Sequence, residues 1–330
     1  MPDEKPKMIA YLLGAGATHA ELIDLEPTVL EKEEEQGLLI RSVSARVIEK
    51  ASREPDYLKN LEMVSGRSGT PNVELLIGLI ESSKIDGWES RTRRLKELVQ
   101  KDIEGILTDD RIEKFWLHKA LIELHRHAVV KAQEDLNGII SLNYDDVADR
   151  AFRAFGDDPN YCFSLEASPT GTQPPLLKLH GSFNWRSVRI RGRTRSIDII
   201  PMGPNKSYLH SPYSFIWNRA LEILIECDTL RVIGCSLSPN DAHLVDLLFR
   251  AHLEKGAAFD IEAIDFDDAG ERIQKSYGFF PQIKKLTEID AGFVPGVEKG
   301  NPFRTWLKYK GMRILKEQIE TTEYVKRVME

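Results

Sequence analysis

The sequence contains little cysteine and no surplus of positive charge. Its 330 residues include three cysteines, Cys162, Cys227 and Cys235, and 45 lysines and arginines against 52 aspartates and glutamates. Three cysteines without a C-x-x-C pair exclude a four-cysteine zinc site and make no disulfide framework. We therefore expect a reducing, cytoplasmic location. The net charge of −7 argues against a protein that coats nucleic acid through its overall charge.

Long hydrophobic runs and biased segments are also missing. The apolar stretch 8–17 follows a charged segment and runs into glycines, with no signal-peptide cleavage pattern. It is too short to span a membrane, and we expect a buried strand instead. The chain has no Walker A pattern, no internal repeat and no low-complexity linker. With 42% apolar residues it can bury a sizeable core, and its length suits about two domains.

Short apolar runs alternate with helical patterns along the chain. The runs lie at 8–13, 138–143, 176–180, 229–234 and 259–265. Strands that alternate with helices in this way indicate a parallel sheet with crossover connections. The sequence predicts an α/β fold, with a Rossmann-like parallel sheet, helices on both faces and a large helical insertion.

The same patterns divide the chain into three parts. Residues 1–27 and 136–295 form the predicted α/β core, 28–135 the helical insertion, and 296–330 a C-terminal helical tail. Within the core, residues 186–200 alternate arginine with apolar or small residues around a glycine, which predicts a β-hairpin. Its five arginines in ten residues, Arg186 to Arg195, suit a nucleic-acid contact, a subunit interface or one solvated face, and the sequence leaves these open.

Small residues follow the first predicted strand, at Gly14, Ala15, Gly16 and Thr18. A phosphate needs close approach to the backbone and free N–H groups at a helix start, and small residues provide both. The dinucleotide-binding fingerprint would require a third glycine where this chain has His19. A tight turn between strand and helix explains the glycines equally well.

Polar residues follow the second and third predicted strands. Asn143 ends the second strand, Asp145 follows it, and His180 ends the third. The carboxyl ends of parallel strands meet at one edge of a sheet, where ligands bind. These residues are therefore candidate site residues, although Asp145 or its neighbour Asp146 also suits the cap of the following helix.

The last two predicted strands end in further candidates. Gly234 ends the fourth strand and Ser236 follows it, and the two could hold a second phosphate or a ribose. Asp265 ends the fifth strand, where a carboxylate could accept hydrogen bonds from ribose hydroxyls. A solvated capping acid is an equally good interpretation of Asp265.

Four motifs in this order resemble the sirtuin-like family. They are G-A-G at 14–16, L-N-Y-D at 142–145, L-H-G-S-F-N-W at 179–185 and G-C-S-L-S-P-N-D at 234–241. Two family features are replaced: an arginine-rich hairpin stands in place of the four-cysteine zinc module, and A-E-L-I-D-L-E-P at 20–27 in place of the G-I-P-D-F-R loop. The chain thus looks like the bacterial antiphage-defence branch that hydrolyses NAD.

This resemblance implies an enzyme, an NAD+ nucleosidase that releases nicotinamide and ADP-ribose, with NAD as substrate and no zinc. It implies that Asn143 orients the water or the ribose, His180 accepts a proton, and Asp145 stabilises the nicotinamide ribose electrostatically. The implied NAD-binding residues are Gly14, Ala15, Gly16, Thr18, Gly234, Ser236 and Asp265.

Two other functions suit the same motifs. One is an NAD-dependent protein deacylase or ADP-ribosyltransferase, and the other is a non-catalytic module that binds NAD or ADP-ribose within an assembly. The resemblance further implies a homo-oligomer, no membrane contact, and a separate sensor partner such as a HerA-type ATPase or a short Argonaute.

Overall fold

The computed structural model describes residues 5–54, 72–164, 173–190, 193–201, 207–235, 237, 241–256, 260–264, 283–285, 301–316 and 326–327. Its centre is a six-stranded parallel sheet in the order β3-β2-β1-β6-β7-β8. The strands are β1 (Lys7–Leu13), β2 (Glu134–Ser141), β3 (Leu176–Lys178), β6 (Thr229–Ile233), β7 (Asp260–Ile264) and β8 (Ile283–Lys285).

This strand order confirms the predicted fold class. The chain winds outward from β1 to β3, then returns to the other side of β1 and continues from β6 to β8. That is the doubly wound, Rossmann-like arrangement, with its topological switch between β1 and β6. The sequence patterns located the first five strands to within a few residues and did not reveal β8.

The central strand β1 is buried on both faces. Ile9, Tyr11 and Leu13 pack into one hydrophobic cluster, and Ala10 and Leu12 pack into the other. Successive side chains of a strand point to opposite faces, so a continuous apolar run fills both cores at once. The unbroken apolar character of 8–13 follows from this position.

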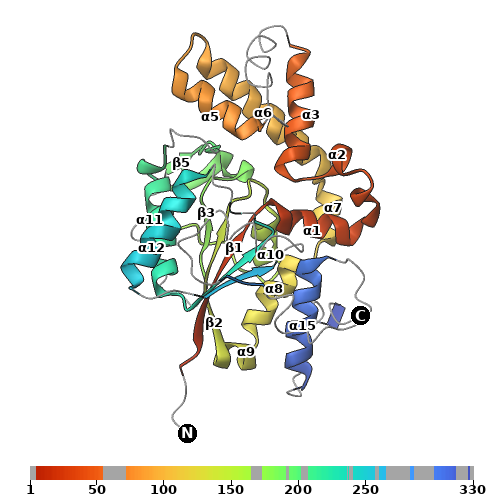
Figure 1. Ribbon diagram of the computed structural model, residues 1–330, viewed down its shortest axis with the longest axis vertical. Helices are drawn as coiled ribbons and strands as arrows, with labels where there is room; N and C mark the ends of the chain where they lie inside the picture. The colour runs from red at the N-terminus through yellow and green to blue at the C-terminus, as the bar shows by residue number, and fades with distance from the viewer. Residues whose placement is uncertain are drawn as a thin grey trace.

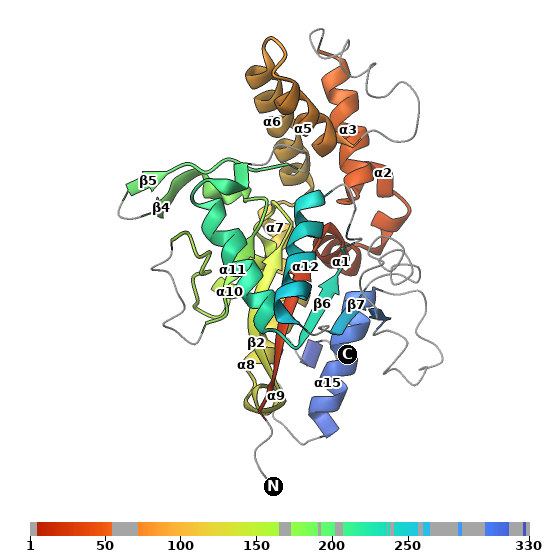
Figure 2. The same cartoon turned by 60° about the vertical axis from the view of Figure 1, so that its left-hand side comes forward.

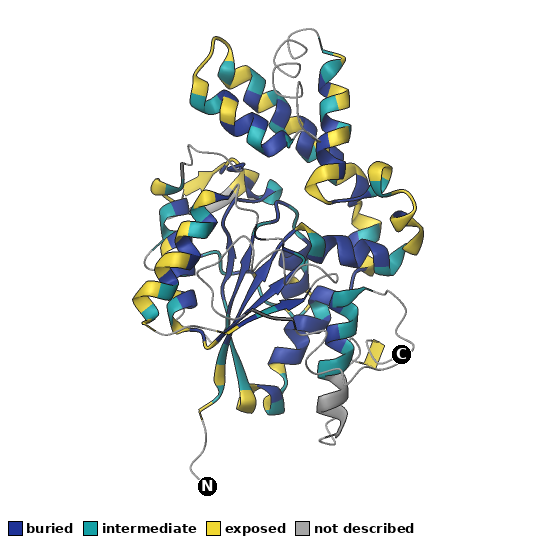
Figure 3. Ribbon diagram, viewed as in Figure 1, coloured by how far each residue is buried: buried dark blue, intermediate teal, exposed yellow. Residues whose placement is uncertain are grey.

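Helices cover both faces of the sheet, as predicted (Figure 1). One face packs against α11 (Tyr213–Glu226) and α12 (Ala242–Lys255). The other packs against α1 (Ala15–Leu25), α8 (Leu117–Arg126), α10 (Val147–Arg153) and α15 (Pro302–Lys316). Figure 3 shows the resulting pattern, with a buried sheet between helices that are buried on their inner sides.

Three helices form a separate layer above the carboxyl ends of the strands (Figure 1). They are α3 (Ile40–Ser52), α5 (Val73–Ser83) and α6 (Trp88–Ile106), and they share a hydrophobic core of their own. We call them the three-helix unit. Short elements connect it to α1 and α8: η1 (Pro27–Leu30), α2 (Glu33–Gln36) and α7 (Asp109–Lys114). A further short helix, α9 (Ala128–Gln133), joins α8 to β2.

The proposed insertion at 28–135 therefore contains helices of two kinds. The three-helix unit has its own core, whereas Leu117, Ala120 and Leu121 of α8 pack on the sheet. The proposed tail at 296–330 contains α15, which also packs on the sheet through Phe303 and Trp306. The domain boundaries themselves stay a prediction.

The predicted hairpin is confirmed. Strands β4 (Val188–Ile190) and β5 (Arg193–Arg195) pair antiparallel as a separate two-stranded sheet. Figure 2 shows the hairpin extending away from the body of the molecule. The side chains of Arg193 and Arg195 are exposed, and the Arg186 guanidinium donates to Gln100 Oε1 of α6 at 2.5 Å.

Candidate functional site

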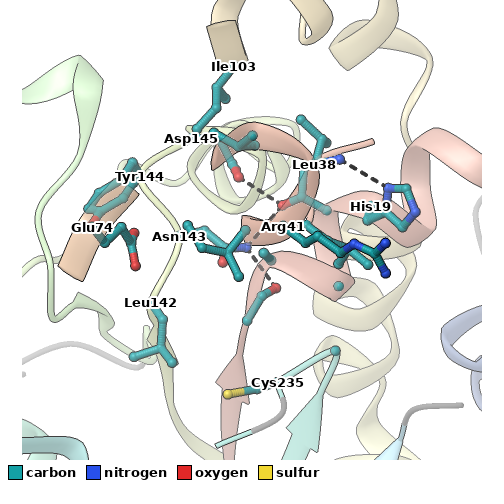
Figure 4. Close-up of a pocket in the computed structure, with 18 of the residues that line it drawn as sticks. His19, Leu38, Arg41, Glu74, Ile103, Leu142, Asn143, Tyr144, Asp145 and Cys235 are labelled. Atoms are coloured by element: carbon teal, nitrogen blue, oxygen red, sulfur yellow. Dashed lines mark hydrogen bonds between the residues drawn. The ribbon is translucent and has the colours of Figure 1, made fainter. Parts of the chain in front are cut away.

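A cavity of about 500 Å³ lies at the switch between β1 and β6, under the three-helix unit (Figure 4). The turns after β1, β2 and β6 line it from the sheet, and residues of α3, α5 and α6 line it from above. Ligand sites of this volume are common, and the switch point is where doubly wound sheets bind ligands. The strand order thus places the cavity where the fold has its natural binding site.

The glycines at the cavity floor let two strand ends touch. Gly14 N donates to Ile233 O at 3.0 Å, and Gly16 N donates to Gly234 O at 2.8 Å. A Cβ on Gly16 would lie 2.7 Å from Gly234 Cα, and Gly234 itself has φ of +56°. The glycines are therefore required by packing, and they also leave bare backbone at the start of α1, where a phosphate could approach.

Asn143, Thr18 and Asp145 form a hydrogen-bonded chain across the cavity (Figure 4). Asn143 Nδ2 donates to Gly14 O at 2.9 Å and to Thr18 Oγ1 at 3.1 Å. Thr18 Oγ1 in turn donates to Asp145 Oδ2 at 3.0 Å. Both amide hydrogens of Asn143 are thereby used, so the orientation of the amide is fixed and Oδ1 is left as its acceptor atom for a ligand.

Asp145 serves the fold and the cavity together. Its Oδ1 accepts from Val147 N at 3.1 Å at the start of α10, while its Oδ2 faces Thr18. Burial raises the pKa of the Asp145 carboxyl above its usual value, and the nearby charge of Lys178 opposes that shift. Asp146, the alternative cap, pairs with Arg150 at 3.0 Å instead.

A buried ion pair supports the loop that carries Asp145. Lys178 Nζ lies 3.0 Å from Asp149 Oδ2, both side chains are inaccessible, and Lys178 also donates to the Asp145 carbonyl. Burial disfavours the charged carboxylate, but Lys178, Tyr161 and other donors hold the pKa of Asp149 below its usual value. Sequence reasoning missed this pair, and its signal was a lysine at the end of the apolar strand 176–178.

His180 lies behind the cavity wall. Its Nε2 is 2.8 Å from Asp241 Oδ2, and both side chains are 1% exposed. Asp241 lines the cavity, and its Oδ1 accepts from Leu244 N at 3.2 Å at the start of α12. Among the described residues the carboxylate, and not the imidazole, is the wall-forming member of the pair. Sequence reasoning quoted Asp241 within G-C-S-L-S-P-N-D but did not assign it a role.

The three-helix unit brings two charged side chains to the cavity, which sequence reasoning also missed. Arg41 comes from the first turn of α3, and Glu74 from the first turn of α5. Figure 4 shows Glu74 beside Tyr144, with Arg41 on the other side of Asn143. Burial, together with the neighbouring Glu74, raises the pKa of the Tyr144 hydroxyl well above its usual value.

His19, which replaces the third glycine of the fingerprint, has a structural partner. Its Nε2 lies 2.9 Å from Glu33 Oε2, and its Nδ1 accepts from Leu38 N at 3.4 Å. Leu38 lines the cavity next to Arg41. The departure from the fingerprint thus fastens α1 to the segment that leads into α3.

The structure brings most of the proposed site residues to one cavity. Those that line it are Gly14, Ala15, Gly16, Thr18, Asn143, Asp145 and Gly234. His180 reaches it through Asp241, and Ser236 and Asp265 lie outside the described residues. The roles of all these residues stay predictions.

The described residues contain neither a cluster of metal ligands nor a membrane-spanning helix. Over the ranges that the structure describes, no group of three or more histidine, cysteine, aspartate or glutamate side chains is arranged to hold a metal ion. Within those same ranges no helix combines the length and apolar character needed to cross a bilayer.

Comparisons with known proteins give distant similarities. No protein-family model and no curated protein matches the sequence. A mutant Sir2 homologue in complex with 2′-O-acetyl ADP-ribose is 15% identical, with a TM-score of 0.36, over 84% of this chain and 94% of that chain. A Sir2 homologue–NAD complex is 17% identical, with a TM-score of 0.33, over 83% and 89%. At such values the fold assignment rests on the strand order of the sheet.

Proposed function

We propose that the chain is an NAD+ glycohydrolase that cleaves the bond between nicotinamide and ribose. The observation that carries the proposal is the convergence of Asn143, Asp145 and the Gly14–Thr18 turn on one cavity at the switch point of the sheet. These are the residues that the sirtuin-like motifs single out. Their order along the chain and their meeting in space support the same reaction.

The chemistry needs little acid catalysis. The nicotinamide ring of NAD+ is cationic, so when the glycosidic bond breaks its electron pair neutralises the ring nitrogen and the base leaves without a proton. Positive charge then develops on the ribose, and carboxylates stabilise it. Asp145 and Asp241 both line the cavity and can act on this charge.

The incoming water must be placed and must lose a proton. We assign placement to Asn143, whose amide is held by Gly14 O and Thr18 Oγ1. The water adds to the anomeric carbon, and its proton passes to the Asp241–His180 pair, in which Asp241 faces the cavity and His180 holds it at 2.8 Å. The products are nicotinamide, ADP-ribose and one proton.

The wider role rests on the resemblance alone. We propose that the enzyme acts in the bacterial cytoplasm, as an effector of antiphage defence that depletes NAD. It would work as a homo-oligomer and respond to a separate sensor protein such as a HerA-type ATPase or a short Argonaute. No zinc would be needed.

Nicotinamide release from NAD+ by the purified chain tests the activity. We expect release by the wild type and at least a 100-fold loss in Asn143→Ala, because the water or ribose loses its positioning group. Asn137→Ala is the matched control: it removes an asparagine from the middle of β2, where Nδ2 contacts Ile223 O at 3.3 Å. Equal loss in both variants would argue for damaged folding instead.

Two further readouts separate the alternative functions. NAD consumption that rises with an acetyl-lysine peptide or a protein acceptor would favour a deacylase or ADP-ribosyltransferase. A higher melting temperature with NAD but no product, alone and with activating partners, would favour a non-catalytic module, because a ligand of the native state stabilises it by mass action. No release and no thermal shift would contradict NAD binding altogether.

A further inference from the structure

The three-helix unit supplies two charges of opposite sign to the cavity. Glu74 and Arg41 both line it, and Figure 4 shows them on opposite sides of Asn143. Glu74 lies on the side of Tyr144, after β2, and Arg41 lies on the side of α1 and His19. The cavity therefore has a negative and a positive end, both set by residues outside the sheet.

The position of Arg41 at the start of a helix is unfavourable for the stability of the fold. It occupies the second position of α3, where the helix dipole is positive and a cation is unfavourable. It is exposed, and among the described residues no carboxylate pairs with it. Arg46, one turn further on, instead contacts Asp102 at 2.7 Å. An exposed arginine that lines the cavity on the side of His19 and α1 suits an anionic ligand group.

Glu74 is placed with the helix dipole. It lies in the first turn of α5, where backbone N–H groups favour a negative charge, and it is only 7% exposed. Asp241 lines the same cavity and, like Glu74, acts through its charge on the Tyr144 hydroxyl, so two carboxylates lie near this end. A buried carboxylate in such a place attracts a ligand cation more strongly than an exposed one, because the interior screens charge weakly.

We propose that Glu74 and Arg41 are specificity-determining residues for the dinucleotide, Glu74 at its cationic nicotinamide ring and Arg41 at its diphosphate. This inference rests on the proposed function and adds a division of labour to it. The sheet edge provides the reacting geometry, and the three-helix unit distinguishes the oxidised dinucleotide from its neutral, reduced form.

Equilibrium binding of three ligands tests the two roles separately. The ligands are carba-NAD+, an analogue that keeps the cationic ring but cannot be hydrolysed, NADH, which lacks the ring charge, and ADP-ribose, which lacks the ring. We expect the wild type to bind carba-NAD+ about tenfold more tightly than NADH, since one charge-assisted contact is at stake. Glu74→Gln should remove that preference and leave NADH and ADP-ribose affinity within about twofold.

Arg41→Gln should act differently. We expect all three ligands to bind about fivefold more weakly, with a smaller dependence of affinity on salt, because the diphosphate is common to them. Without ligand the melting temperature should stay the same or rise, since an unfavourable charge leaves the start of α3. The matched controls are Glu89→Gln in α6 and Arg53→Gln at the end of α3, both exposed, and neither should alter any affinity.

The outcomes distinguish this inference from the proposed function. If the wild type binds none of the ligands, the proposed function fails and this inference fails with it. If the wild type binds them but Glu74→Gln keeps the preference for the cation, or Arg41→Gln keeps full affinity, only the inference is overturned. Should Glu74→Gln fail to fold, Glu74→Asp decides: the retained charge should retain the preference, and a lost preference would contradict us.

Discussion

Two polar networks join strands or strand ends of the same sheet. They differ in whether their polar groups face other groups of the chain or a cavity. One centres on Arg231 of β6, whose guanidinium contacts Glu134 at 2.8 Å, Glu262 at 2.7 Å and the Tyr11 hydroxyl at 3.1 Å. Lys310 of α15 adds a contact to Glu134 at 2.6 Å, and Arg231 is 3% exposed. The other is the chain of Asn143, Thr18 and Asp145 at the cavity.

The comparison shows that burial of charge does not by itself identify a site. The three guanidinium nitrogens of Arg231 all donate to acceptors of the same chain, and α15 covers the group from outside. Around Asn143 the donors are satisfied, but the carboxylates and the amide oxygen face a cavity. We call the group around Arg231 the closed network and the group around Asn143 the open network. The closed network stabilises the fold, whereas the open network has acceptor atoms that a ligand in the cavity can reach.

Breaking the closed network should have the largest effect on stability. We expect Arg231→Met to lower the free energy of unfolding by about 3–5 kcal/mol, because it leaves the carboxylates of Glu134 and Glu262 without their buried partner. Urea unfolding measures this. Lys310→Met, which removes one of two cations from Glu134, should cost less. A loss below about 1 kcal/mol in Arg231→Met would contradict the view that this network stabilises the fold.

The open network depends on backbone contact at its floor. In Gly234→Ala the new Cβ would lie 2.2 Å from Ala17 N, on a residue with φ of +56°. We expect a loss of about 3 kcal/mol and weaker NAD binding, since strain and collision both displace the turn. Gly256→Ala is the matched control, because φ there is +65° but nothing lies within 4 Å. It should cost about 1 kcal/mol and leave binding intact.

His125 makes the closed network sensitive to acid. Its Nε2 lies 2.7 Å from the Tyr11 hydroxyl, and burial, aided by the charge of Arg231, lowers its pKa to about 3. Between its unfolded pKa of about 6.5 and that value, the unfolded chain binds a proton that the native chain does not. Stability should therefore fall as pH falls through this window.

From pH 6.5 to 5 the contribution of His125 should amount to about 2 kcal/mol. We expect His125→Gln to flatten that part of the stability profile, measured by urea unfolding at several pH values. The raised pKa of Asp145 works in the opposite direction, because its native carboxyl keeps a proton that the unfolded chain releases as pH rises. An unchanged acid slope in His125→Gln would contradict the assignment.

The exposed arginines of the hairpin give the smallest expected effect. Arg193 and Arg195 belong to neither network and are exposed on β5. Replacing both with serine should change the free energy of unfolding by less than about 0.5 kcal/mol. The same variant sorts the three interpretations of the hairpin: salt-dependent DNA binding that disappears indicates a nucleic-acid contact, a changed oligomeric state indicates an interface, and no change indicates a solvated face.

The sequence predicted the sheet because its strands are buried on both faces. Continuous apolar runs such as 8–13 are a direct consequence of two cores, and they were readable without the structure. Strand β8 has the sequence I-K-K, with a single apolar residue, so it forms no apolar run that the sequence could reveal. The two kinds of helix within 28–135 were also invisible, since an amphipathic pattern indicates a buried face but not the core that buries it.

Only the site residues that lie at the ends of strands could be predicted from the sequence. Asn143, Asp145 and the glycines follow strands of the sheet, and the fold places them together. Glu74 and Arg41 come from helices whose position over the sheet depends on tertiary packing, so no local pattern marked them. Asp241 lines the cavity in front of His180 because it caps the start of α12, where its Oδ1 accepts from Leu244 N. The sequence alone did not show this arrangement and favoured the histidine.

The central position of β1 has a consequence for the synthesis of the protein. Its partners are Glu134 to Ser141 on one side and Thr229 to Ile233 on the other, so the strand made first pairs with segments made more than a hundred and two hundred residues later. Until β6 has left the ribosome, one edge of an apolar strand is without its neighbour. The nascent chain must therefore keep β1 from aggregating during most of its translation, and folding is completed late.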